Sequence, residues 1–452
     1  MKSTEKQSEL FSNADLKALI IPLVLEQALA VTVGMADTVM ISSAGEAAVS
    51  GVSLVDMLNM LIFSMLSALA TGGTVVASQY LGAGKRQDAC RAARQVLFTV
   101  LVFSLLMAGG MILFRRSLLR LFFGRIEDAV MEAALIYLVI SALSFPFLGL
   151  YNACAALFRA MGRTKTTFTV SVIGNLINIA GNALCIYGLH MGVAGVALPS
   201  LLSRAVMGLL LYRLLKNPNL TLHFDRERFR LDGAMIRRVL YIGVPGGLEN
   251  GVFQLGRVLV VSIISGFGTI QIAANGVANS LDSMGCIIGQ AMNLAMVAVI
   301  GRCAGTRDLQ QIRFYTRKLL LITYAATAVL NSLMLLFLTP ILSLYRLSPE
   351  TTELAYTLVM IHNGLAIFLW PLSFVFPNML RACNDVRFPM VISIFSMFAF
   401  RIGFSYILGV GLGMGAIGVW IAMVIDWVFR LICFVGRYFH GDWKRTLYRL
   451  NP

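Results

Sequence analysis

Charged residues are scarce in this sequence. Aspartate, glutamate, lysine and arginine make up 13% of its 452 residues, whereas they form about a quarter of an average soluble domain. The seven cysteines include no C-x-x-C pair, and the four histidines are too scattered for an H-E-x-x-H motif. These absences exclude the common zinc motifs and give no support to a disulfide scaffold. Because the sequence shows no clustered His, Cys or Asp constellation, we expect no enzyme activity, no cofactor and no resident metal.

Apolar residues take the place of the missing charge. They make up 58% of the chain, and the mean hydropathy is +0.80. Because a run of about 20 apolar residues crosses a bilayer as a helix, we predict an all-α membrane protein with twelve spans. The predicted spans are 15–42, 49–78, 92–114, 130–152, 166–188, 194–214, 239–267, 272–300, 318–341, 353–378, 388–410 and 415–436.

The basic residues indicate how the spans are oriented. The net charge is +15, and 28 of the 37 Lys and Arg residues fall in the tails and even-numbered connections or within three residues of the adjoining span ends, against five in the odd-numbered connections. Basic residues collect in cytoplasmic loops, so we predict a multi-pass plasma-membrane protein with both termini in the cytoplasm and no nucleic-acid partner. The segment FRRSLLRLFFGR, with four of the five outer charges, is the exception. The polar tail MKSTEKQSEL and the lack of a cleavage pattern after the first apolar segment predict a retained first span.

The second half of the chain repeats the first 223 positions later. Pro22 and Glu26 recur as Pro245 and Glu249, and MGVAGVA recurs as MGAIGVW. Six spans return the chain to the same side of the membrane, so the two copies are parallel, and transporters built from such repeats bind their substrate near the repeat interface. We therefore predict an N-lobe at 1–215, a cytoplasmic linker at 216–238 and a C-lobe at 239–452.

Four stretches carry further motifs. They are P-x-x-x-E followed by GMADTVMISSAG in the first span, ASQYLGAGKRQDACRAAR after the second, LFRAMGRTK at the end of the fourth with its repeat MLRACNDVR, and NLINIAGNALCI in the fifth. In this order they resemble the multidrug and toxic compound extrusion (MATE) family, over essentially the whole chain. The resemblance implies two six-helix lobes around a V-shaped cavity and export by alternating access, driven by proton or sodium influx. We expect a monomer in the lipid bilayer that exports small lipophilic, cationic drugs or metabolites, since aromatic faces attract cations.

Carboxylates within spans are costly and are therefore candidates for ion coupling. Glu26 and Asp37 are 11 residues apart, which places them on one helical face about 16 Å apart. Loss of water favours the protonated form of a carboxylate and a nearby cation favours the charged form, so we predict that Asp37 alternates between the two. Pro22 supplies a kink in the same span. The alternatives are that Asp37 only hydrogen-bonds across helices and that Glu26 is a solvated residue at the lip of the cavity.

Three amides on the fifth span share one helical face. Asn175, Asn178 and Asn182 follow at spacings of three and four. Asn182 stands where members of the family that this chain resembles often carry aspartate. This difference removes one possible proton acceptor, so we expect Asp37 to be the more important one. We assign Asn178 and Asn182 to ion coupling and Asn175 to the substrate cavity, with interhelical hydrogen bonding as the alternative for each.

The second lobe offers its own coupling residues. The resemblance implies that Glu249 is the acidic residue of the seventh span, which in sodium-coupled members works with an aspartate on the tenth. No carboxylate lies between Glu353 and Asp385, so we favour protons over sodium. Asp282 on the eighth span is a further coupling candidate, with Arg257 as its expected partner.

The substrate cavity is expected to include Tyr137, Trp370 and Arg401. Trp370 falls at or next to the position of the missing tenth-span acid, and the sequence Trp370-Pro371 predicts an irregular span and a hinge. Arg401 aligns with Asn178 in the repeat. It is either a partner of the substrate or a structural counter-charge.

Other classes of protein remain as alternatives. A lipid-linked oligosaccharide or lipid flippase of the same wider superfamily needs a cavity rich in arginine. Only Arg204, Arg257, Arg401 and Arg430 lie more than three residues inside a span, and Asp426 is expected to offset Arg430 four residues later. A major facilitator transporter needs a different motif between its second and third spans. A structural or receptor protein does not need Asp37 or the duplicated P-x-x-x-E.

Overall fold

The computed structural model describes residues 10–42, 45–124, 127–224 and 229–450, and nearly all regular structure in these ranges is helical. The first half contains α1 (Asn13–Ser42), α2 (Glu46–Gly82), α3 (Arg86–Leu113), α4 (Arg115–Phe123), α5 (Asp128–Ala160), α6 (Thr164–Ala183), the π-helical η1 (Leu184–Gly188) and α7 (Ala194–Leu214). The second half contains α8 (Gly233–Ser265), α9 (Thr269–Gly285), α10 (Ile287–Thr306), α11 (Leu309–Leu336), α12 (Leu338–Ser343), α13 (Pro349–Trp370), η2 (Pro371–Val375), α14 (Pro377–Ala382), α15 (Arg387–Ser396), η3 (Met397–Ile402), η4 (Ser405–Gly411), α16 (Gly415–His440) and α17 (Trp443–Leu450). Within the described residues, 12 helices are long and apolar enough to cross a membrane, which confirms the predicted number.

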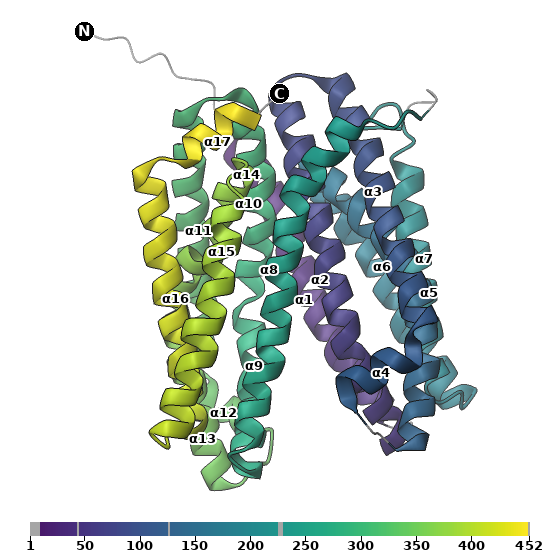
Figure 1. Cartoon of the computed structure of the whole chain (residues 1–452), viewed down its shortest axis with the longest axis vertical. Helices are drawn as coiled ribbons and strands as arrows, with labels where there is room; N and C mark the ends of the chain where they lie inside the picture. Colours follow the sequence, from purple (N-terminus) through teal and green to yellow (C-terminus); the bar gives the residue numbers. More distant parts are fainter. Residues whose placement is uncertain (1–9, 43–44, 125–126, 225–228, 451–452) are drawn as a thin grey trace.

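The helices form two bundles that together have the shape of a V. Figure 1 shows α1–α7 in one bundle and α8–α17 in the other, close together at the end that carries α17 and spread apart at the end that carries α4 and α12. The exceptional basic segment of the sequence forms α4, a short amphipathic helix near the wide end. The predicted all-α fold with two six-span lobes is confirmed.

The linker between the bundles is shorter than predicted. Helix α8 begins at Gly233, inside the predicted linker of 216–238, because the side chain of Asp232 caps it by accepting a hydrogen bond from the Met235 amide at 3.1 Å. The apolar run alone did not show this polar first turn. Residues 225–228 of the linker lie outside the described residues.

The first helix of each lobe packs against the second span of the other lobe. Helix α1 contacts α10, and α8 contacts α2. Phe11, Leu16 and Leu23 of the N-terminal half are fully or almost fully buried in the same hydrophobic cluster as Met292 and Leu319 of the other half. The two lobes therefore share one core at the narrow end of the V.

Two glycines bring the lobes into backbone contact at this narrow end. Gly82 and Gly305 are equivalent in the repeat, as are Gln79 and Arg302. A Cβ on Gly82 would overlap the carbonyl of Arg302, and a Cβ on Gly305 would overlap the carbonyl of Gln79. In each lobe the glycine therefore contacts the backbone carbonyl that lies three residues before the equivalent glycine of the other lobe. Only glycine fits at these two positions.

The spans of the C-lobe are interrupted. Helix α13 ends at Trp370 and continues into η2, where the Phe376 amide donates to the Pro371 carbonyl at 2.9 Å, which confirms the predicted irregular tenth span. The eighth span was predicted as one helix over 272–300 but is divided at Cys286 into α9 and α10. Helix α1, in contrast, continues through Pro22.

Candidate functional site

A cavity of about 760 Å³ lies between the two lobes. It is lined by α1 and α2 from the N-lobe and by α8–α10, α13, η2, α14, η3 and α16 from the C-lobe. Trp370 and Arg401, two of the predicted cavity residues, line it, as do Glu249 and Asp282. The other two, Tyr137 and Asn175, are not among its lining residues in the part of the chain that the structure describes.

The wall of this cavity combines aromatic rings with charge. Its large rings are Phe253, Phe374, Trp370, Trp420 and Trp427. Four arginines line it against two carboxylates, namely Arg257, Arg381, Arg401 and Arg430 against Glu249 and Asp282. The cavity therefore suits a molecule with an apolar body, and its fixed charge is predominantly positive.

Two of the arginines share one buried carboxylate. Arg430 Nε lies 2.8 Å from Asp426 Oδ1, which confirms the expected pair, and Arg401 Nε lies 3.7 Å from Asp426 Oδ2. Asp426 is fully buried. The Arg401 guanidinium also lies over the ring of Phe253, 5.1 Å from its centroid. One carboxylate does not neutralise both arginines, so this wall keeps a net positive charge.

Each lobe holds an ion pair between an arginine and the glutamate of its P-x-x-x-E motif. Arg159 lies 3.7 Å from Glu26 in the N-lobe, and Arg381 lies 2.6 Å from Glu249 in the C-lobe. Glu26 also accepts hydrogen bonds from the hydroxyls of Tyr151 at 3.0 Å and Thr167 at 3.2 Å. Sequence analysis placed both arginines in cytoplasmic segments and did not pair them with the glutamates. The coupling roles predicted for Glu26 and Glu249 stay predictions, but both carboxylates already have a fixed counter-charge.

A second polar cluster lies inside the N-lobe, apart from the lining of the cavity. Asn182 donates a hydrogen bond from Nδ2 to Asp37 Oδ1 at 2.8 Å, which joins α6 to α1. The same amide lies 3.4 Å from Asn178 Oδ1, and Asn178 donates to Ser200 Oγ at 2.9 Å. Asn175 instead donates to the Ser171 carbonyl on its own helix. The structure thus brings Asp37, Asn178 and Asn182 together, and the coupling role predicted for them stays a prediction.

Asp56 belongs to the same cluster and was missed by sequence analysis. Its Oδ1 accepts hydrogen bonds from the Tyr137 hydroxyl at 3.0 Å and from Asn59 Nδ2 at 3.2 Å. Arg204 interacts electrostatically with both Asp37 and Asp56. The sequence did contain a signal for Asp56, because this carboxylate lies within the predicted span 49–78. A carboxylate within a span is a candidate for ion coupling, which is the reason that Asp37 was selected.

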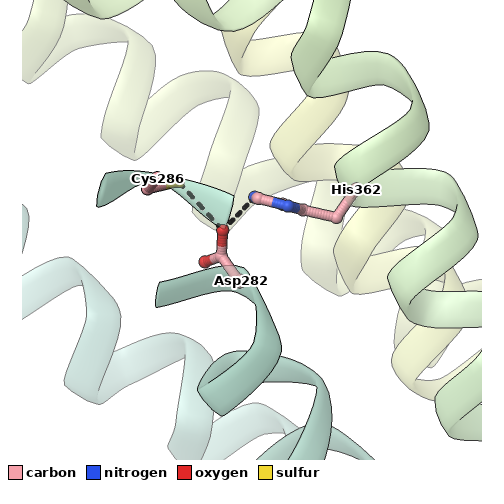
Figure 2. A group of neighbouring side chains, drawn as sticks. All are labelled: Asp282, Cys286 and His362. Carbon is pink, nitrogen blue, oxygen red and sulfur yellow. Dashed lines mark hydrogen bonds and ion pairs between the residues drawn. The ribbon is translucent and has the colours of Figure 1, made fainter. Parts of the chain in front are cut away.

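A third cluster lies in the C-lobe and faces the cavity. His362 Nε2 lies 2.9 Å from Asp282 Oδ1, and Cys286 Sγ lies 3.2 Å from the same oxygen (Figure 2). The expected partner of Asp282, Arg257, is therefore not its direct partner, although its charge acts on the carboxylate. Sequence analysis found no such constellation, since 80 positions separate Asp282 from His362.

The two lobes carry the same acid and amide in opposite order. Asp56 and Asn59 on α2 recur 223 positions later as Asn279 and Asp282 on α9. Each lobe therefore keeps one carboxylate on this face of its second span. The carboxylate of the C-lobe lines the cavity, whereas that of the N-lobe lies in the inner cluster.

Twelve spans in two parallel lobes, with a charged cavity between them, define a secondary transporter. The MatE family model matches the chain twice, at residues 22–184 and 245–407, with the same offset as the repeat. The chain belongs to the multidrug and toxic compound extrusion family.

Two curated relatives and one solved structure illustrate the similarity. The chain is 28% identical over 437 residues to an uncharacterized transporter, YisQ, of Bacillus subtilis (strain 168), covering 94% of each chain. It is 24% identical over 446 residues to a probable multidrug resistance protein, NorM, of Thermotoga maritima, covering 95% of this chain and 93% of that protein. A solved outward-facing multidrug resistance MATE family transporter of the MOP superfamily has the same fold, with a TM-score of 0.89 at 20% identity over 95% of this chain and 96% of that one.

Proposed function

We propose that this protein is a monomeric, proton-driven exporter of small lipophilic molecules that works by alternating access in the plasma membrane. The observation that carries the proposal is the N-lobe cluster around Asp37. Asp37 receives a hydrogen bond from the neutral amide of Asn182, whereas Glu26 on the same helix has an arginine partner. Arg204 acts on both Asp37 and Asp56, so Asp37 can gain a proton while Asp56 still balances that buried charge.

The donors around the cluster support protons over sodium. Amide N–H groups of Asn182 and Asn59 and the hydroxyl of Tyr137 point at the carboxylate oxygens of Asp37 and Asp56. Sodium would need these carboxylate oxygens as ligands, and Asp37 Oδ1 and Asp56 Oδ1 already accept hydrogen bonds. Proton transfer needs no such cage, and protonation of Asp37 is proposed to favour substrate release.

The shape of the molecule supports the direction of transport. The V widens at the end opposite α17 (Figure 1). With both termini in the cytoplasm, as the basic residues predict, the wide end faces outward and the cavity delivers its substrate there.

The charges of the cavity bear on the substrate. Sequence analysis expected lipophilic cations, and the aromatic wall supports a lipophilic body. The four arginines around the cavity support instead a substrate with an anionic group, because Arg257 is exposed and the Arg401–Arg430 pair has a single shared carboxylate. We propose a small amphipathic anion as substrate, with the lipophilic cation as the competing class.

One observation favours a second candidate function. A flippase was disfavoured by the small number of arginines in spans, yet three of those four, Arg257, Arg401 and Arg430, line the cavity together. An anionic lipid headgroup would meet the same charges as a small amphipathic anion. The two functions differ in whether the substrate leaves the membrane.

Transport from vesicles tests these proposals. Purified protein is reconstituted in liposomes, and efflux of a fluorescent lipophilic cation and a fluorescent amphipathic anion is followed under a proton gradient and separately under a sodium gradient. We expect proton-driven efflux that Asp37→Asn abolishes and that Asp88→Asn, a control at a surface ion pair on α3, leaves intact. Normal efflux by Asp37→Asn would show the coupling site to lie elsewhere, and flipping of a labelled anionic lipid without efflux of either dye would favour the second candidate.

A further inference from the structure

Three side chains of different chemistry meet at the break between α9 and α10. Asp282 lies on the last turns of α9, Cys286 is the residue at the break, and His362 reaches them from α13 (Figure 2). The carboxylate, the thiol sulfur and the imidazole nitrogen all lie within 4.8 Å of one another. All three side chains line the cavity.

The hydrogen bonds behind His362 fix which of its nitrogens carries a proton. Asn331 donates from Nδ2 to the carbonyls of Thr327 and Gly285, so its Oδ1 is free to accept from Asn363 Nδ2 at 2.9 Å. Asn363 Oδ1 therefore faces His362 Nδ1, at 3.1 Å, as an acceptor. The Nδ1 atom donates this bond and carries the hydrogen.

The other nitrogen consequently meets Asp282 with a lone pair. In the neutral ring, Nε2 is an acceptor, and it lies 2.9 Å from a carboxylate oxygen, which is also an acceptor. Two acceptors at this distance require a cation between them. Trp420 and Trp427 hold the imidazole by edge contacts, with centroids 5.4 Å and 4.7 Å away, so the ring is not free to turn.

We propose that Asp282, Cys286 and His362 form a site for one divalent transition-metal ion of the zinc class. Carboxylate, thiolate and imidazole are the three ligand types that zinc takes in proteins, and a site with three protein ligands leaves a fourth position open. Here that position faces the cavity and is available to water or to a donor atom of a transported molecule.

The geometry needs little change to accept the ion. Zinc bonds of about 2.0–2.3 Å in a tetrahedron separate the oxygen from the nitrogen by about 3.4 Å and from the sulfur by about 3.6 Å. The separations in the structure are 2.9 Å and 3.2 Å, so each of these two pairs needs to open by a few tenths of an ångström, and the nitrogen and the sulfur lie within 4.8 Å of each other. On binding, the thiol proton that Cys286 now donates to Asp282 and the proton held between His362 and Asp282 would both leave to the cavity water.

The surroundings match those of a metal site. A histidine ligand almost always donates its second ring nitrogen to an oriented acceptor, and Asn363 is such an acceptor. Gly285 makes room for this arrangement, because a Cβ there would lie 2.5 Å from both Asn331 Oδ1 and Asn363 Nδ2. The carboxylate and the thiolate together balance the charge of a divalent ion. Metal binding therefore adds no net positive charge beside Arg257 and Arg401, which both interact electrostatically with Asp282.

Metal binding to the full-length protein tests the site without reference to transport. The protein is purified with a tag free of histidine, treated with a chelator and dialysed against zinc, and bound metal is counted by mass spectrometry. We expect one zinc ion per chain. Cobalt(II) in its place should give a thiolate-to-cobalt absorption band.

Variants separate this site from adventitious binding. Cys286→Ser should lose the cobalt band, and Asp282→Asn and His362→Gln should each lower zinc affinity by at least tenfold. Asn363→Ala, which removes the acceptor of the His362 hydrogen bond, should cost about 10–100-fold. Cys185→Ser, a partly buried cysteine elsewhere, should bind zinc like the unaltered chain. Substoichiometric zinc in the unaltered chain, or full binding by Asp282→Asn in a sample with an unchanged elution profile, would refute the proposal and leave a proton as the cation between His362 and Asp282.

Discussion

The ion pair between Glu26 and Arg159 allows a sharp test of what Glu26 does. Replacement by glutamine keeps the size of the side chain and an acceptor oxygen for one of the two hydroxyls, those of Tyr151 and Thr167, but it removes the charge. Arg159 would then remain with its side chain only 10% exposed and without its counter-charge. We therefore expect Glu26→Gln to destabilise the folded protein, and Glu26→Gln combined with Arg159→Gln to restore much of the loss.

The magnitude follows from the separation and the burial. At 3.7 Å, two unit charges attract by about 4 kcal/mol if the effective dielectric constant is about 20. Removing one partner from a buried pair costs about 3–5 kcal/mol in other proteins. The two values agree, so we expect a coupling energy of about 3 kcal/mol or more between the two positions in a double-mutant cycle.

Unfolding in mixed detergent micelles measures this cycle, and liposome efflux on the same four proteins measures coupling. If the ion pair is structural, stability and efflux fall together in Glu26→Gln and recover together in the double variant. A Glu26→Gln protein as stable as the unaltered chain that has lost its response to a proton gradient would refute this reasoning. Glu26 would then be a coupling residue, as the sequence first suggested.

Three further outcomes are expected. Asp56→Asn should abolish proton-driven efflux as Asp37→Asn does, because both carboxylates belong to one cluster, and a normal response to the gradient in liposomes would exclude Asp56 from coupling. Arg257→Gln should weaken binding of an amphipathic anion by about tenfold, which corresponds to about 1.4 kcal/mol, without weakening that of a lipophilic cation, as measured by dye displacement. Gly289→Val should displace the Trp370 ring, since even a Cβ at Gly289 would overlap it, and should alter substrate affinity but not the zinc content; unchanged affinity would remove Trp370 from the binding wall.

The fold was predictable because its determinants are local or repeated. Span number follows from apolar runs, and the relation of the lobes follows from residues that recur at a fixed distance, such as Glu26 and Glu249. The start of α8 and the break at Cys286 were not predictable from hydropathy. The start of α8 depends on a single capping side chain, that of Asp232. The break at Cys286 lies beside Gly285, against which the amide side chains of Asn331 and Asn363 from two other helices pack.

The site was predictable only where its members share one helix or one rule. Asp37 and Asn182 were both selected, the first as a charge within a span and the second by its place on a polar helical face. The contact between Asp282 and His362 depends instead on how α13 packs against α9, and no spacing in the sequence encodes it. Arg159 and Arg381 were counted as loop charges, yet their long side chains reach back from the span ends to the buried glutamates.

The glycine contact at the narrow end of the V bears on how fast the transporter can change state. Gly82 and Gly305 place backbone against backbone, so no side chain at these two positions has to change its rotamer when the lobes separate there. Beside this contact, Gln79 Nε2 donates to the Ala382 carbonyl at 2.8 Å and to Asn384 Oδ1 at 3.0 Å, so these hydrogen bonds between the lobes must break when the contact opens. The contact closes again in a single register, because the shapes on its two sides fit together at one position only.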